Sequence, residues 1–94
     1  MPLDKKKILS FLRKNSRLFA EQYNVHRIGL FGSYVHEKQS PGSDIDILVE
    51  GENIGENELK DFLERNLGGT VDIVKEHSLY NFMKYLIHKE TEYA

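Results

Sequence analysis

The sequence predicts an α/β (α+β) domain in which a small mixed sheet of three or four strands is flanked by helices. First, 94 residues allow one hydrophobic core but not two, so residues 1–94 are expected to form a single domain. Second, hydrophobic residues make up 39% and charged residues 30% of the chain, as in folded globular domains. Third, helical segments alternate with short β-branched runs, and a small sheet must be covered by helices to close a core.

The first segment, from Asp4 to Tyr23, is expected to be one helix. Asp4 is placed to cap its N-terminus, and Asn24 is placed to end it. Its apolar residues recur at helical spacing and form a single buried stripe, namely Ile8, Leu9, Leu12, Phe19 and Tyr23.

The first strand is predicted from Val25 to Phe31, where Ile28 and Leu30 point to the same side. A Gly-Ser pair at 32–33 breaks this strand. The polar stretch 37–43 contains a Pro-Gly pair, which is a strong turn signal. We therefore expect an exposed loop there, after at most one helical turn.

A second strand is expected over Asp44–Val49, a stretch that is β-branched and apolar apart from two acids. A helix ended by Gly68-Gly69 follows, with apolar residues at helical spacing: Leu59, Phe62, Leu63 and Leu67. The third strand is expected over Thr70–Val74. Ser78 is placed to cap a last helix, whose apolar face would consist of Leu79, Phe82, Met83, Leu86 and Ile87.

The composition excludes several classes of function. The net charge of −2 provides no basic field for general nucleic-acid binding. The chain has no cysteine, which excludes disulfides and thiolate sites and leaves oxygen ligands or histidine for a metal. No run approaches the ~18 apolar residues of a membrane span, and the N-terminus lacks a signal-peptide core, so a cytoplasmic location is expected.

Three acids interrupt the apolar strands. Asp44 and Asp46 share one face of their strand, while Ile45 and Ile47 anchor the opposite face in the core. Two such carboxylates repel each other unless a cation intervenes, and a hard divalent cation is the usual remedy at neutral pH. Asp72 could complete the site, since burying it unpaired in its apolar strand would be costly.

Each acid also has an ordinary structural interpretation. Asp44 could cap a turn, and Asp46 could lie on a solvent-facing surface of the sheet. Asp72 could pair with Lys60 or Lys75. For any one acid taken alone, the structural interpretation is the more frequent one.

The combination with Gly32 and Ser33 favours a functional site. Glycine lets a phosphate approach the backbone, where N–H groups and a hydroxyl can receive it. Gly32-Ser33, ten residues and then Asp44-Ile45-Asp46 resembles the signature of the DNA polymerase β-like nucleotidyltransferase superfamily. The stretch 43–46, Ser-Asp-Ile-Asp, matches its commonest written form.

Over nearly the whole chain, the sequence resembles the minimal nucleotidyltransferase (MNT) family. Asp72 lies where the family has its third carboxylate, on a later strand, and the closing residues 90–94 are similar to those of short members. The resemblance implies a nucleotidyltransferase-like fold without an appended substrate domain. It also implies a HEPN-domain protein as partner.

The resemblance further implies ATP as substrate and a two-metal mechanism with Mg²⁺, for which Mn²⁺ could substitute. The catalytic and metal-binding residues would be Asp44, Asp46 and Asp72. The nucleotide would be bound by Gly32 and Ser33 at its β- and γ-phosphates, together with Ser43. Paired ions activate the attacking hydroxyl and stabilise departing pyrophosphate, so no protein nucleophile is needed.

The chain departs from the family after the Gly-Ser pair. It has Val35-His36-Glu37 where Ala-Arg-Gly is frequent, which affects phosphate contacts from this turn but not the carboxylates. The histidines lack zinc-site spacing and are interpreted as solvated or structural.

Two hypotheses from different classes follow. In the first, the chain is an enzyme that moves AMP from ATP to a hydroxyl; by resemblance, the acceptor is a tyrosine of a HEPN-type toxin and the chain is its antitoxin. In the second, it is a non-catalytic module that neutralises a partner by binding. Three acids within apolar strands favour the enzyme.

The last helix is a candidate docking surface for such a partner, because Tyr80, Tyr85 and Tyr93 lie beside its apolar face. Phe82 and Leu86 are expected to pack on the sheet instead. The residues leave open the base preference and whether a homo- or hetero-oligomer forms.

Overall fold

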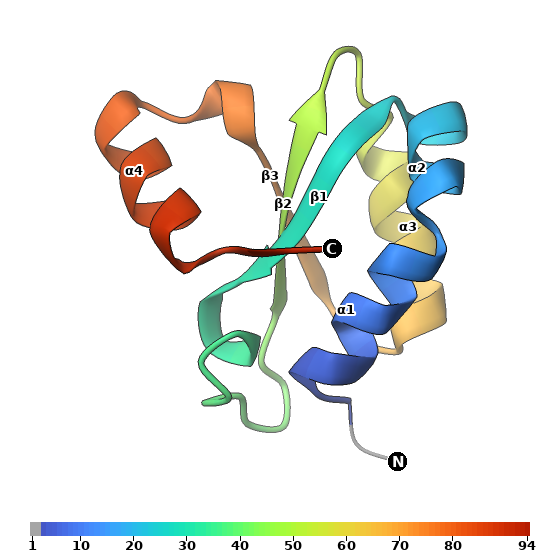
Figure 1. Ribbon diagram of the computed structural model, residues 1–94. Coiled ribbons are helices and arrows are strands. Elements are labelled where there is room, and N and C mark those ends of the chain that lie inside the picture. Colours follow the sequence, from blue (N-terminus) through green and yellow to red (C-terminus); the bar gives the residue numbers. More distant parts are fainter. Residues whose placement is uncertain (1–2) are drawn as a thin grey trace.

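The structure is a computed structural model that describes residues 3–94 (Figure 1). Its longer elements are, in chain order, α1 (Lys5–Lys14), α2 (Ser16–Tyr23), β1 (Val25–Phe31), β2 (Ile45–Gly51), α3 (Glu56–Leu67), β3 (Val71–Lys75), α4 (Asn81–Glu90) and β4 (Glu92–Tyr93). Single 3₁₀ turns follow β1 at Gly32–Tyr34 and β3 at Glu76–Ser78.

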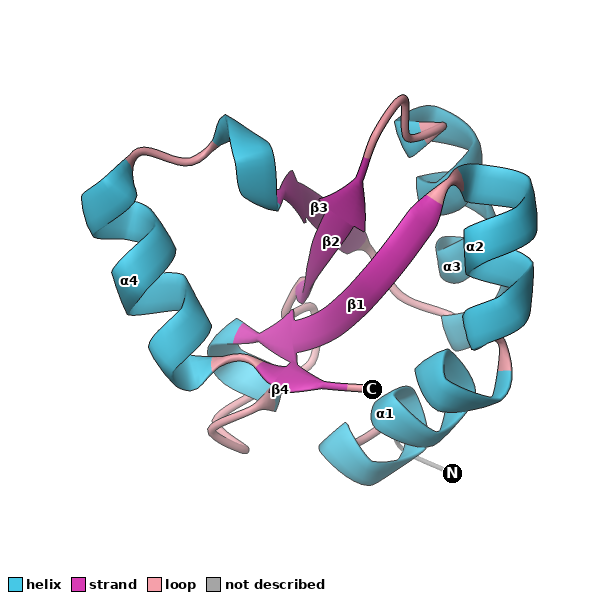
Figure 2. Ribbon diagram, turned by 45° about the horizontal axis from the view of Figure 1, so that its top comes forward, coloured by secondary structure: helices cyan, strands magenta, loops and turns pink. Residues whose placement is uncertain are grey.

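The strands form one four-stranded mixed sheet, as the sequence predicts, and their order is β3-β2-β1-β4. β1 is antiparallel to both β2 and β4, whereas β2 and β3 are parallel. The parallel pair is joined by α3, because parallel strands need a long crossover. β4, the short strand beside β1 in Figure 2, carried no sequence signal because two residues cannot show a period.

Helices α1, α2 and α3 cover one face of the sheet (Figure 1). The main hydrophobic core lies between them and consists of Ile8, Leu9, Leu12, Phe19, Val25, Ile28, Leu30, Tyr34, Val35, Ile45, Ile47, Val49, Leu59, Leu63, Val71 and Ile73. The apolar stripe predicted for the first helix supplies four of these residues. Tyr23 of that stripe packs against the cluster from its edge.

The single helix predicted over Asp4–Tyr23 is wrong, because α1 ends at Lys14 and α2 begins at Ser16. Asn15 breaks it: the backbone there turns to φ −105° and ψ 14°, and the side-chain amide donates to the carbonyl of Phe11 at 2.9 Å. Asparagine readily makes such local bonds in competition with helical geometry.

Three of the four predicted helix boundaries are confirmed. Asp4 accepts a hydrogen bond from the Lys7 N–H at 2.8 Å, and Asn24 and Gly68 end their helices in the left-handed conformation. Ser78 is not the cap of the last helix. It ends a 3₁₀ turn, and extended backbone at Leu79 and Tyr80 separates it from the start of α4.

Helix α4 lies on the opposite face of the sheet from the other helices (Figures 1 and 2). The expectation that Phe82 and Leu86 pack on the sheet is wrong, since they are 71% and 42% exposed. Of this helix only Ile87 is buried. The large apolar side chains exposed on and beside α4 are Tyr80, Phe82, Met83, Tyr85 and Leu86.

Within residues 3–94, none of the helices has the length and apolar character needed to cross a membrane.

Candidate active site

The acids of β2 and β3 are brought together by the pairing of these strands. Ile45, Ile47 and Val49 of β2 are fully buried in the main core. By alternation Asp46 points to the opposite face, the one toward α4. Asp46 and Asp72 are direct partners in the parallel register, and paired residues on neighbouring strands project from the same face.

Asp44 lies just outside β2, which begins at Ile45 rather than at Asp44. Its side chain is exposed, and so is that of Asp72. Asp72 thus avoids the cost of burial in its apolar strand, because β3 is an edge strand. The alternative pairings fail: in the described residues no ion pair joins Asp72 to Lys60 or Lys75, and Lys75 pairs with Glu56 at 3.6 Å.

Asp46 is the acid whose environment is most perturbed. Burial of its side chain, followed by the negative charges of Asp72 and Asp44, raises the pKa of Asp46 to about 6. The carboxylate of Glu90 acts in the same direction. Like charges without an intervening cation disfavour the ionised form, so this face of the sheet carries an uncompensated negative field.

Gly32, at the end of β1, lies directly against the Asp46 carboxylate. Its backbone has φ +79°, and a Cβ at this position would overlap Asp46 Oδ2. Glycine is therefore required here for two reasons: the left-handed backbone conformation and the close approach of the Asp46 carboxylate. The turn that follows is anchored by Tyr34 and Val35, which are buried in the main core.

The Gly32 N–H does not point into free space. It donates to Glu90 Oε1 at 3.2 Å, and His36 Nε2 lies 3.0 Å from Glu90 Oε2. Sequence reasoning missed Glu90 as a residue of this site, because it is 58 residues from Gly32 and carries no motif of its own. It enters the site because α4 ends beside the turn.

Ser43 shapes the loop before β2. Its hydroxyl accepts from the Ser40 N–H at 2.8 Å, and its own N–H donates to the Ser40 carbonyl at 2.9 Å. These bonds close the turn that delivers Asp44 to the start of the strand.

The donor set fits a hard divalent cation. Asp44, Asp46 and Asp72 offer only carboxylate oxygens, which Mg²⁺ and Mn²⁺ prefer. The raised pKa of Asp46 reflects burial first and then the negative charges of Asp72 and Asp44, which a cation would neutralise. As the side chains stand, no set of three Asp, Glu or His groups in residues 3–94 is placed closely enough to hold an ion. The strand register supplies the two central donors, and Asp44 lies next to them in the chain.

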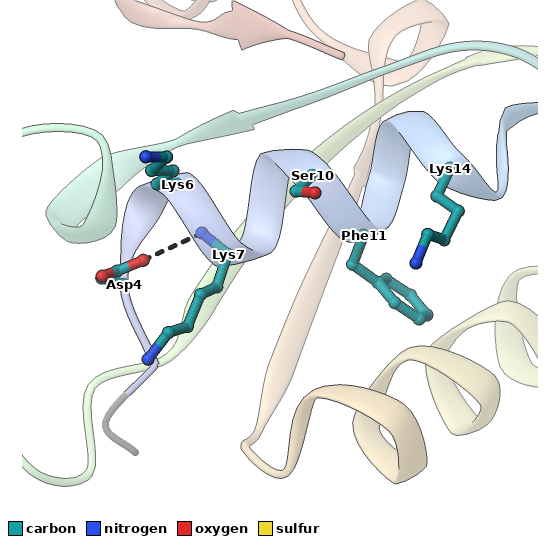
Figure 3. A pocket seen from close by; sticks show the side chains of 6 residues that line it. All are labelled: Asp4, Lys6, Lys7, Ser10, Phe11 and Lys14. Carbon is teal, nitrogen blue, oxygen red and sulfur yellow. Dashed lines mark hydrogen bonds between the residues drawn. The ribbon is translucent and has the colours of Figure 1, made fainter.

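One hollow of the surface lies away from these acids. It is an open groove of about 490 Å³ along α1, lined by Asp4, Lys6, Lys7, Ser10, Phe11 and Lys14 (Figure 3). Because α1 covers the face of the sheet opposite to Asp46 and Asp72, this groove is separate from the candidate site.

Known proteins resemble this chain along nearly its whole length. The family model for the nucleotidyltransferase domain matches residues 5–94. The protein adenylyltransferase MntA of Thermococcus cleftensis is 36% identical, with 93% of this chain and 92% of that protein covered. A Methanocaldococcus jannaschii protein provisionally named a protein adenylyltransferase is 37% identical, with 93% and 94% covered.

Solved structures share the fold. A chain described provisionally as a minimal nucleotidyltransferase has a TM-score of 0.78 and 28% identity, with 96% of this chain and 95% of that chain covered. A chain from the crystal structure of a toxin–antitoxin with AMP-PNP has a TM-score of 0.69 and 30% identity, with 97% and 72% covered. The chain therefore belongs to the nucleotidyltransferase domain family, and it is a nucleotidyltransferase of the minimal (MNT) group.

Proposed function

We propose that this protein transfers AMP from ATP to a protein hydroxyl in a Mg²⁺-dependent reaction, with a tyrosine of a HEPN-type toxin as the acceptor. The observation that carries the proposal is the position of Asp46. Its carboxylate lies in register with Asp72 and directly against the Gly32 turn. The carboxylates proposed as metal ligands and the Gly32–Ser33 turn thus meet at one point.

The residues of the chain would have distinct roles. Asp44, Asp46 and Asp72 would hold two Mg²⁺ ions, and Mn²⁺ could replace them. When bound, these ions would neutralise charge on the triphosphate and lower the pKa of the attacking hydroxyl. The Gly32–Ser33 turn would receive the β- and γ-phosphates, and Ser43 would support the loop on the nucleotide side.

The transfer itself is a displacement at the α-phosphorus of ATP. The acceptor oxygen forms the new P–O bond, the bond to the β-phosphate oxygen breaks, and pyrophosphate leaves with its electron pair. The hydroxyl proton passes to solvent. The protein contributes position and electrostatics, which suffice for phosphoryl-type transfers.

A protein acceptor and the antitoxin role are supported by the relatives. MntA of Thermococcus cleftensis is named a protein adenylyltransferase, and a chain of similar fold was crystallised in a toxin–antitoxin with AMP-PNP. The exposed apolar side chains of α4 suit the same role, because α4 flanks the face that carries the acids. A partner bound there would bring its hydroxyl to the carboxylates.

The test is incubation of the purified protein with its co-expressed HEPN-type partner, Mg²⁺ and ATP labelled at the α-phosphate. We expect label and added AMP mass on a partner tyrosine, and neither with Asp44→Asn or Asp46→Asn. Glu92→Ala is a matched control, since it removes an acid that pairs with Lys5 away from the site.

A second candidate function is neutralisation by binding alone. The exposed apolar face of α4 favours it, because that surface could mask a partner without chemistry. An unmodified partner that the Asp46→Asn variant still neutralised would establish this function in place of transfer.

A further inference from the structure

The end of α4 is tied to the turn that follows β1 by a single side chain. Glu90 is the last residue of α4, and its two carboxylate oxygens accept separately from the turn. Oε1 accepts from the Gly32 N–H at 3.2 Å, and Oε2 lies 3.0 Å from His36 Nε2. The carboxylate therefore bridges Gly32, the first residue of the turn, and His36, two residues beyond its end at Tyr34.

The position of Glu90 is set by the residues that follow it. Thr91 follows the last residue of α4, and its hydroxyl donates a hydrogen bond to the Ile87 carbonyl at 2.5 Å. The next strand, β4, then pairs with β1 at Gly29 and Leu30. A Cβ at Gly29 would lie 2.5 Å from Thr91 Cγ2. The C-terminal segment thus crosses β1 in close contact, three residues before Gly32, and fixes where Glu90 reaches the turn.

Gly32 is consequently held from two sides. Asp46 occupies the space where a Cβ would be, and Glu90 accepts the N–H of the same residue. Since this N–H is already engaged, it is not available to a phosphate. The N–H groups of Val35 and His36 donate to the Gly32 carbonyl. The Ser33 hydroxyl is the group of the Gly32–Ser33 pair that is left for a phosphate.

We infer that Glu90 is a positioning residue for the triphosphate of the nucleotide. It holds the Gly32–Ser33 turn in its left-handed conformation by accepting the Gly32 N–H and pairing with His36, and it does not itself contact the substrate. This inference rests on the proposed function, because it assigns the turn to nucleotide binding. It changes the role of Gly32 from a phosphate donor to a point of close approach.

The experiment distinguishes the effect of side-chain length from the effect of the negative charge at position 90. Binding of α,β-methylene-ATP, whose α–β linkage cannot be cleaved, is measured by calorimetry with Mg²⁺ for the wild type and for Glu90→Gln, Glu90→Asp and Glu90→Ala. Glutamine keeps an acceptor oxygen at the same reach, whereas aspartate keeps the charge but is one methylene shorter. Glu21→Ala is the control, because Glu21 is an exposed acid of α2 that pairs with Arg17 on the other side of the sheet. Thermal melting checks folding.

We expect Glu90→Ala and Glu90→Asp to bind the analogue about tenfold more weakly, the loss that follows from removing one hydrogen bond. Glu90→Gln and Glu21→Ala should stay within about twofold of the wild type. In transfer assays, KM for ATP should rise for Glu90→Asp while kcat and KM for the partner change little.

The results that would overturn the role of Glu90 differ from those that would overturn the proposed function. Tighter binding by Glu90→Ala would overturn the inference, because Glu90 would then be a competitor of the phosphate. Unchanged binding by both Glu90→Asp and Glu90→Ala would overturn it and leave the proposed function standing. Absence of analogue binding by the wild type would overturn the proposed function, and the role of Glu90 with it. If Glu90→Ala does not fold, the comparison of Glu90→Asp with Glu90→Gln decides.

Discussion

Asp46 on β2 and Asp72 on β3 are direct partners across two parallel strands, and both project toward the side of the sheet where α4 lies. Parallel pairs in register place like side chains about 5 Å apart. Two carboxylates at that spacing are unfavourable for the isolated domain, so the arrangement sacrifices stability at the point where the nucleotide and its metal ions are proposed to bind.

Replacing Asp46 tests how much stability the folded domain loses by holding this carboxylate beside Asp72. Asp46 takes up its proton near pH 6 in the folded chain and near pH ~4 when unfolded. Between these values the folded state binds more protons, so the free energy of unfolding should fall as pH rises from about 4 to about 6. Asp46→Asn should remove this fall and be the more stable protein at pH 7–8, as measured by urea unfolding at each pH. A wild type that gains stability over that window would contradict the assignment.

Adding Mg²⁺ or Mn²⁺ should raise the melting temperature, because an ion that binds only the folded state stabilises it. Protons and cations compete for Asp46, so the increase should be larger at pH 8 than at pH 5. Asp46→Asn should show a much smaller increase at both pH values. Melting that is unchanged by either ion at pH 8 would count against the metal site.

Gly32→Ala should impair both folding and transfer. The new Cβ would adopt φ +79° and overlap the Asp46 carboxylate. Gly42→Ala is a matched control, since Gly42 has φ +91° but nothing within 4 Å of a Cβ. We expect the control to lose about 1–2 kcal/mol from backbone strain alone and to retain transfer. Gly32→Ala should lose about 1–3 kcal/mol more from overlap. Equal losses of stability in the two variants would show that a Cβ at position 32 does not overlap Asp46.

Phe82→Ser should weaken the partner complex without harming the fold. Phe82 is 71% exposed, so its removal should change stability by less than about 0.5 kcal/mol. If α4 is the docking surface, affinity for the HEPN-type partner should fall about tenfold or more, as for a buried aromatic anchor. Arg17→Ala, on α2 across the sheet, serves as the control. Equal affinities of the two variants would place the interface elsewhere.

Several features were accessible from the sequence because they depend on short-range rules. Strand alternation predicted that Ile45 and Ile47 enter the core while Asp46 does not, and the structure confirms it. Asp4 and Gly68 mark helix ends because capping involves only the neighbouring backbone. Asn15 shows where such rules fail, since a side chain that can bond its own backbone interrupts an otherwise continuous helical pattern.

What the sequence by itself determined is therefore the three longer strands and the helices between them, apart from the break at Asn15. It also determined the apolar face of β2 and the spacing of Gly32, Asp44 and Asp46 that resembles a nucleotidyltransferase. Only the tertiary structure decided that Asp72 lies in register with Asp46 and that Glu90 reaches Gly32, because both depend on pairings between distant segments. It also decided that the apolar stripe of α4 is largely exposed. The sheet face toward α4 carries Asp46, Asp72 and Gly29 in place of a continuous apolar surface, so the stripe has little to pack against.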